Sequence, residues 1–149
     1  MEGKIINQTL HINAGITALM LAIFVGSRIG FDSNDEIKHY NLPWILMGTS
    51  ILWLGWYGFN VGSALTVRDV ATQAFLTITV ATGTSFVVWM FLDIFLEEKT
   101  TMVGLCTGSL CGLVGITPAA GYVTVAGAFA IGLICTLAST PSSMSSNLG

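Results

Sequence analysis

The sequence predicts an all-α fold, a polytopic transmembrane helical bundle with about five membrane spans within residues 1–138. Only 9% of the 149 residues are charged and 53% are apolar, and the mean hydropathy is +0.78. Soluble domains carry roughly 25% charged residues. The charges are also clustered, which leaves charge-free runs at 11–27, 39–67, 70–92 and 100–149. Since a helix of about 20 apolar residues crosses the hydrocarbon core, such runs are typical of membrane spans.

Each predicted span ends at a polar segment. The linker at 28–41 is rich in charged side chains, and Arg68-Asp69 form a polar turn. Pro43 stands at the start of the second span, where a missing N–H costs little. The predicted spans are approximately 5–26, 42–64, 70–96, 102–116 and 122–137. The remaining residues, 139–149, are low in complexity and predict a disordered tail.

Glycines in the fourth span predict close helix packing. Gly104, Gly108 and Gly112 recur every four residues and therefore share one helix face. Small residues at this spacing let helices approach closely in lipid. We give the same packing interpretation to glycines and small residues elsewhere, at Gly58, Gly62, Gly127 and 130–132.

His11 is the first candidate functional residue, because it lies a few residues inside the first span. An imidazole can donate and accept hydrogen bonds and can exchange a proton near neutrality. At bilayer depth it can accept a hydrogen bond from a small hydride such as ammonia, or relay a proton. The alternative is a structural histidine bonded to a carbonyl of a neighbouring helix, and spacing alone leaves both open.

A second candidate is an aromatic and hydroxyl stripe near the end of the second span. Phe59 and Ser63 are four residues apart and Trp56 is three before Phe59, so all three share one helix face. Aromatic faces attract cations, and a serine hydroxyl can accept a hydrogen bond from an ammonium-like donor. The alternative is an interfacial aromatic belt with ordinary packing, to which Trp44, Trp53 and Tyr57 are also suited.

Three polar residues of the later spans allow structural interpretations as well. Asp93 is an intramembrane carboxylate and therefore a candidate for function. It lies only one turn before Glu97-Glu98, so an interfacial carboxylate that caps or pairs is the preferred interpretation. Thr107 and Thr117 carry hydroxyls in and after the fourth span, and such hydroxyls can simply bond to carbonyls of their own helix.

The sequence contains no pattern that predicts catalysis, a cofactor or a metal site. No second histidine lies inside a span to pair with His11, and GxSxG, P-loop and metal-ligand motifs are absent. We therefore expect a protein that is not an enzyme. A net charge of −3 with isolated basic residues predicts no nucleic-acid partner and leaves the lipid membrane as the expected surroundings.

Three motifs, in this order, resemble the ammonium transporter (Amt/Mep/Rh) family. They are His-Ile-Asn-Ala-Gly at 11–15, Gly-Trp-Tyr-Gly-Phe-Asn-Val-Gly-Ser at 55–63 and Gly-Leu-Val-Gly-Ile-Thr-Pro-Ala-Ala-Gly-Tyr at 112–122. The resemblance implies a partial ammonium-transporter fold, similar to about spans five to nine of eleven. It also implies transport of ammonium, ammonia or methylammonium by an integral protein of the plasma membrane, which in complete form is a homotrimer.

The resemblance also implies roles for individual residues. His11 corresponds to the first histidine of the twin-histidine pore, Phe59 to one ring of the phenylalanine gate and Ser63 to the outer recruitment site. Trp56 is a supporting aromatic, and Thr107 and Thr117 take pore-associated or packing positions.

The chain departs from the family pattern, because the second pore histidine, the other gate ring and the Asp-aromatic-small-Gly-Gly sequence before the first histidine are absent. We therefore expect a fragment, a splice product or a mispredicted gene. The alternative function is a non-conducting membrane fragment or interaction protein derived from a transporter gene.

Overall fold

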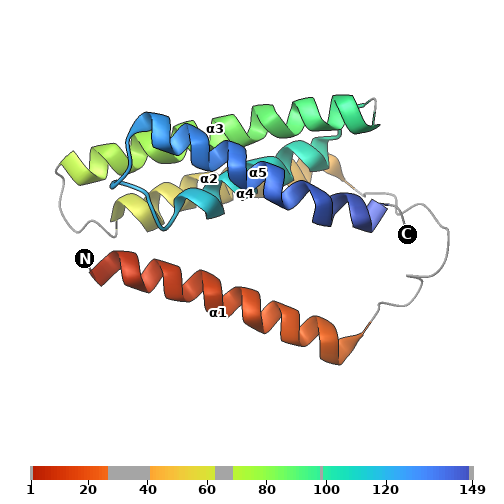
Figure 1. Cartoon of the computed structure of the whole chain (residues 1–149), viewed down its shortest axis with the longest axis horizontal. Helices are drawn as coiled ribbons and strands as arrows, with labels where there is room; N and C mark the ends of the chain where they lie inside the picture. Colours follow the sequence, from red (N-terminus) through yellow and green to blue (C-terminus); the bar gives the residue numbers. More distant parts are fainter. Residues whose placement is uncertain (1, 27–40, 63–68, 98, 148–149) are drawn as a thin grey trace.

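The computed structural model describes residues 2–26, 41–62, 69–97 and 99–147 of the chain. Every regular element in these ranges is a helix, which confirms the predicted all-α class (Figure 1). The five helices are α1 (Glu2–Val25), α2 (Leu42–Gly62), α3 (Asp69–Glu97), α4 (Met102–Ile116) and α5 (Val125–Asn147). Their bounds lie within three residues of the predicted spans, except at the end of α5.

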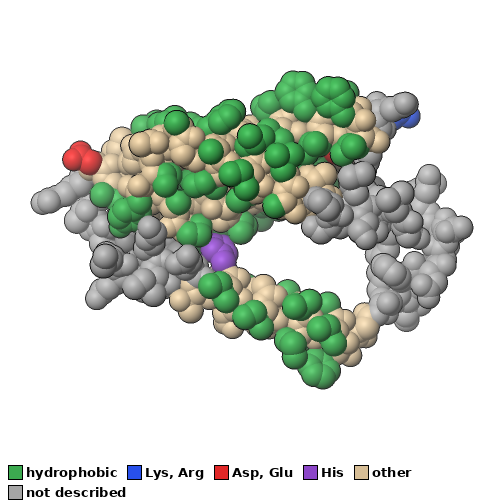
Figure 2. Space-filling model, viewed as in Figure 1, with side chains coloured by type: hydrophobic (Ala, Val, Ile, Leu, Met, Phe, Trp, Pro, Cys, Tyr) green, Lys and Arg blue, Asp and Glu red, His purple; other side chains and the backbone are tan. Residues whose placement is uncertain are grey.

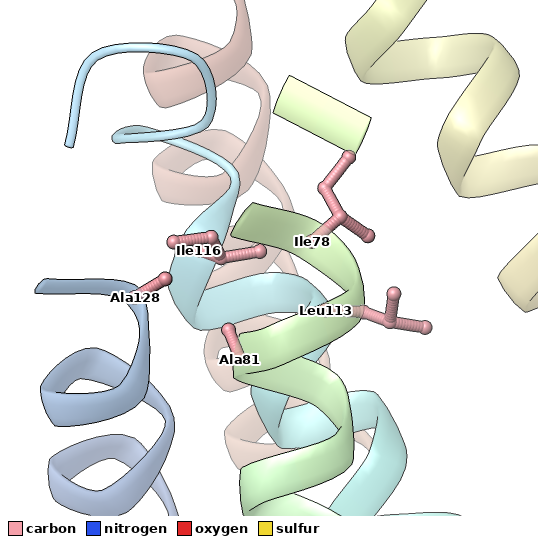
Figure 3. Packing of buried hydrophobic residues seen from close by; sticks show 5 residues of the cluster. All are labelled: Ile78, Ala81, Leu113, Ile116 and Ala128. Carbon is pink, nitrogen blue, oxygen red and sulfur yellow. The ribbon is translucent and has the colours of Figure 1, made fainter. Parts of the chain in front are cut away.

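Helices α2 to α5 form one packed body, with α3 in extensive contact with both α4 and α5. Its centre is a cluster of buried apolar side chains from α3, α4 and α5 (Figure 3). These are Ile78, Ala81, Leu113, Ile116 and Ala128, each with no exposed surface. The side chains of α2 cover this cluster from one side through Trp53, Trp56, Tyr57 and Val61.

The glycine stripe of α4 is the surface that packs on α3, as the four-residue repeat predicts. A Cβ added at Gly108 would lie 2.5 Å from the Cβ of Trp89, and one at Gly112 would lie 2.6 Å from Oγ of Ser85. Real Cβ atoms do not approach neighbours this closely, so these positions accept only glycine without movement of the helices. The packing prediction for Gly104, Gly108 and Gly112 is confirmed.

The packing prediction for two glycines of α2 stays a prediction. Cβ atoms built at Gly58 and Gly62 meet nothing within 4 Å in the described part of the chain. Their periodicity indicates a small-residue face, but only the tertiary arrangement decides whether a neighbour covers it. On α5, by contrast, a Cβ at Gly132 would lie 2.5 Å from the backbone oxygen of Ala81, so that glycine does pack on α3.

Asp93 joins the end of α3 to the start of α4, in agreement with the capping interpretation. Its side chain is 8% exposed, and its Oδ2 accepts from the backbone N–H of Thr101 at 3.1 Å and from the Thr101 hydroxyl at 3.3 Å. Thr101 is the N-cap of α4, and its Oγ1 accepts from the N–H of Gly104 at 3.0 Å. Asp93 therefore extends an ordinary threonine cap into a link between two helices.

Helix α1 lies apart from the body formed by α2 to α5 (Figure 1). Its apolar side chains are largely exposed; Ile12, Leu19 and Phe24, for example, are 60%, 61% and 80% exposed. Large apolar side chains are exposed over the other helices as well, as the green surface in Figure 2 shows. Such a surface is unfavourable in water and suits either lipid or further helices.

One described helix, Asp69–Leu96, is long and apolar enough by itself to cross a bilayer. The segments Thr9–Val25, Met102–Ile116 and Val125–Thr140 are shorter apolar helices. The number of five spans therefore stays a prediction from the charge-free runs.

Helix α5 continues to Asn147, so residues 139–147 are helical where the sequence predicts a disordered tail. The hydroxyls of Ser139 and Thr140 donate to carbonyls one turn earlier, at 2.8 Å each, which lets these polar residues continue the helix.

Candidate functional site

Three aromatic rings from α1 and α2 lie in contact and form the core of the candidate site. The His11 imidazole is stacked on the Trp56 indole, with centroids 5.9 Å apart and an interplanar angle of 17°. The ring of Phe59 is tilted at 56° to the indole, with centroids 6.0 Å apart. The helical spacing of three residues explains the second contact, whereas the first joins segments 45 residues apart. In Figure 2 the histidine, in purple, lies between α1 and the body of the molecule.

The His11 imidazole carries an uncommitted polar atom at this contact. Its Nε2 is buried and has no hydrogen-bond partner in the described part of the chain. Leaving a polar atom buried without a partner costs about 1–3 kcal/mol, so such atoms are few in native proteins and call for an explanation. Among residues 2–26, 41–62, 69–97 and 99–147, Nε2 makes no bond to a helix carbonyl; the choice between the pore and the structural interpretation of His11 stays a prediction.

The Trp56 indole is fixed on its other side by the end of α4. Its Nε1–H donates to Oγ1 of Thr117 at 2.8 Å, and the Thr117 hydroxyl donates to the carbonyl of Leu113 at 2.7 Å. Trp56 is thus more than part of an interfacial aromatic belt, because it lies between α1 and α4. Its partner Thr117 is 3% exposed.

The sequence after α4 explains why Thr117 stands where it does. It is the C-cap of α4, and the Thr-Pro-Ala-Ala-Gly segment that follows turns the chain towards α5. The turn ends at Gly121, whose φ is +78° and where a Cβ would lie 3.0 Å from the carbonyl oxygen of Val70. A residue with a side chain is disfavoured there by both conformation and space.

Other aromatic residues of α2 face α3 and form a separate packing group. The Trp53 indole donates to the Tyr57 hydroxyl at 3.1 Å, and Tyr57 is 2.8 Å from the Thr79 hydroxyl. The Thr79 hydroxyl donates to the carbonyl of Phe75, so the Tyr57 hydroxyl is the donor to Thr79. The Tyr57 and Phe75 rings are stacked 4.5 Å apart. Here the packing interpretation of the aromatic residues describes the structure.

The remaining predicted site residues are not part of the ring group as described. Ser63 lies outside the described residues. The Thr107 hydroxyl donates to the carbonyl of Val103 at 2.9 Å, and Thr107 lies ten residues before Thr117, or about 15 Å along a helix. Sequence reasoning also passed over Asn60, which is one turn from Trp56 and only 5% exposed. The sequence feature that could have identified Asn60 is its polar amide side chain inside a charge-free span.

This fold and site define a polytopic helical membrane protein, with an apolar outer surface and a half-buried histidine and indole beside a buried hydroxyl at the meeting point of three helices. Residues 6–145 match the family model described as "Ammonium Transporter Family". The chain belongs to the ammonium transporter family, which confirms the resemblance seen in its motifs.

Relatives and solved structures agree with this assignment. An ammonium transporter of Mycobacterium tuberculosis is 43% identical over 133 residues, covering 87% of this chain and 28% of the relative. An ammonium transporter of Aquifex aeolicus is 42% identical over 128 residues, covering 86% of this chain and 29% of the relative. The crystal structure of Candida albicans Mep2 superposes with a TM-score of 0.77 at 37% identity, covering 84% of this chain and 28% of Mep2. The chain thus spans less than a third of the length of these proteins.

Proposed function

We propose that this chain forms part of a path for ammonium or ammonia across the membrane, as one portion of an ammonium transporter subunit. The observation that carries the proposal is the buried His11 Nε2, which has no partner among the described residues and whose ring stacks on Trp56, itself in contact with Phe59. A neutral imidazole nitrogen at this place can accept a hydrogen bond from ammonia or exchange a proton with it. Relatives with the name "Ammonium transporter" at about 40% identity support the substrate class.

The aromatic residues in this proposal act before His11 along the path. The Phe59 ring is 38% exposed and contacts the Trp56 indole, which in turn is stacked on the His11 imidazole. It can therefore exclude water and cations from the imidazole, as a gate. Ser63, one turn further along the sequence, is proposed to recruit the ammonium ion with its hydroxyl. Methylammonium is proposed as a second substrate, and the complete protein as a homotrimer of the plasma membrane.

A second candidate function is a non-conducting membrane protein that associates with other helices. The observation that favours it is the separation of α1 from the body, with apolar side chains exposed along its length. A path lined on one side by α1 and on the other by α2 needs further helices to close it, since lipid would otherwise enter.

The two functions are separated by expression in cells that lack ammonium transport. Residues 1–149 alone are expected to give no growth on low ammonium. A chimera in which residues 6–145 replace the matching segment of the Mycobacterium tuberculosis transporter is expected to take up methylammonium. His11→Ala should reduce uptake by the chimera at least tenfold, and His39→Ala, which changes the other histidine of the chain, should not.

Two results would contradict the proposal. Unchanged uptake by the His11→Ala chimera would remove the imidazole from the path. A correctly inserted chimera without uptake would favour the non-conducting alternative. Saturable uptake by residues 1–149 alone, abolished by His11→Ala, would show that copies of this chain can close a path by themselves.

A further inference from the structure

The hydrogen bonds around Thr117 leave it no proton to offer to a ligand. A threonine hydroxyl has one donor and two acceptor sites. The donor is used on the carbonyl of Leu113 at 2.7 Å, and one acceptor site is used by the Trp56 Nε1–H at 2.8 Å. The indole in turn has only one donor, so the Trp56 N–H is committed as well. Neither the Thr117 hydroxyl nor the Trp56 indole N–H is therefore free to donate a hydrogen bond to a ligand beside His11.

The same bonds form a continuous line from the core of the body to the imidazole. Leu113 and Ile116 have no exposed surface and hold the last turn of α4 in place. The carbonyl of Leu113 fixes the Thr117 hydroxyl, which fixes the edge of the indole. The face of the indole then lies against the imidazole at an interplanar angle of 17°.

We propose that Thr117 is a positioning residue, which holds the Trp56 indole in one orientation and thereby sets the plane of the His11 ring. The direction of the unpartnered Nε2 follows from that plane, because a ring nitrogen presents its hydrogen-bonding site within the plane of the ring. The consequence for transport rests on the function proposed above, whereas the ring geometry does not.

The chemistry of the site explains why a hydroxyl is needed at position 117. Valine has the shape of threonine but cannot accept a hydrogen bond, so Thr117→Val leaves the indole N–H without its partner. Serine keeps the oxygen, so Thr117→Ser retains the bond. Thr136 offers a matched control, because it is fully buried and donates to the carbonyl of Gly132 at 2.8 Å, but accepts no indole.

The test uses the full 149-residue chain in phospholipid nanodiscs, with isotope-labelled tryptophan and histidine. Four indole N–H signals and two imidazole signals are expected, and Trp56→Phe and His39→Gln identify those of Trp56 and His11. Thr117→Val should move the Trp56 indole proton upfield and shift the His11 ring signals in the same direction as Trp56→Phe does. Thr117→Ser and Thr136→Val should leave both sets of signals close to their original positions.

The proposal is overturned if Thr117→Val folds and leaves both sets of signals in place. If Thr117→Val does not fold, the contact between Trp56 and Thr117 is tested in the unmodified chain. An N···O separation of 2.8 Å brings the indole proton of Trp56 close to the side-chain protons of Thr117. A nuclear Overhauser cross-peak between them supports the contact, and its absence overturns it.

A transport measurement in the chimera tests the consequence for function. We expect Thr117→Val to lower the maximal rate of methylammonium uptake about fivefold to tenfold, in line with the loss of one hydrogen bond of about 1 kcal/mol. In a Trp56→Phe background the same substitution should have no further effect, since the group to be positioned is gone. An equal loss in both backgrounds would mean that Thr117 acts directly or on folding. A chimera without any uptake would count against the proposed function. The positioning role of Thr117 would then be tested by the NMR spectra alone.

Discussion

Replacing Gly132 by alanine tests the close packing of α5 on α3. The added Cβ would lie 2.5 Å from the backbone oxygen of Ala81, whereas ordinary contacts begin at 3.4 Å, so the helices must separate locally by about 0.9 Å. A backbone oxygen cannot move aside by a change of rotamer. The same separation stretches the 3.0 Å hydrogen bond from the Ser85 hydroxyl to the carbonyl of Gly132.

These effects set the size and the sign of the change in stability. Overpacking of a buried site costs about 1–3 kcal/mol, and a weakened hydrogen bond adds about 1 kcal/mol. Alanine regains up to about 1 kcal/mol of helix propensity over glycine. We therefore expect Gly132→Ala to lower the free energy of unfolding by about 2 kcal/mol. Gly58→Ala meets nothing within 4 Å and should raise it by up to about 1 kcal/mol, through propensity alone.

The pair can be compared by unfolding the detergent-solubilised chain with increasing SDS, followed by circular dichroism and tryptophan fluorescence. The measured quantity is the difference between the two variants, expected at about 2–3 kcal/mol, because both share the same Gly→Ala change in the unfolded state. A Gly132→Ala chain as stable as the Gly58→Ala chain would refute the reasoning, since the α3–α5 contact would then have room for a methyl group.

Substitutions at three further positions give expected outcomes. Asp93→Ala should lower the free energy of unfolding by about 1–3 kcal/mol by leaving the Thr101 donors unpaired, whereas Asp93→Asn keeps an acceptor and should cost much less in the same SDS titration. Tyr57→Phe removes the donor to Thr79 and should lower the free energy of unfolding by about 1 kcal/mol. A loss of methylammonium uptake by the chimera that carries Tyr57→Phe would contradict the assignment of Tyr57 to packing. Ser63→Ala in the chimera should raise the apparent KM for methylammonium more than it lowers the maximal rate, and the reverse pattern would exclude the recruitment role.

The helices and the packing face of α4 could be predicted from local sequence. Charge-free runs fix where membrane helices lie, and the ends of α4 agree with the prediction at both Met102 and Ile116. The four-residue repeat of glycines in α4 identifies its packing face because helical periodicity is a local property. The repeat at Gly58 and Gly62 carries the same signal, but no described residue lies within 4 Å of a Cβ built there, and the sequence does not say which small-residue faces are covered by which helix.

The candidate site was only partly predictable, for a similar reason. Helical spacing brings Trp56 and Phe59 together, and the charge-free surroundings single out His11. The hydrogen bond between Trp56 and Thr117 joins residues 61 positions apart, so no local pattern relates them. The possibility that Thr117 bonds to its own helix was correct, but it was incomplete, because the same oxygen also accepts the indole proton.

The loose attachment of α1 has a consequence for the way the subunit is put together. Helices α2 to α5 hold one another through buried side chains and interhelical hydrogen bonds, whereas α1 meets them at a stack of two rings. Among the described helices, the position of α1 is therefore the one least constrained by contacts with the others. Whatever packs against the outer side of α1 also sets the depth and tilt of the His11 imidazole, so helix association and the geometry of the candidate site are coupled.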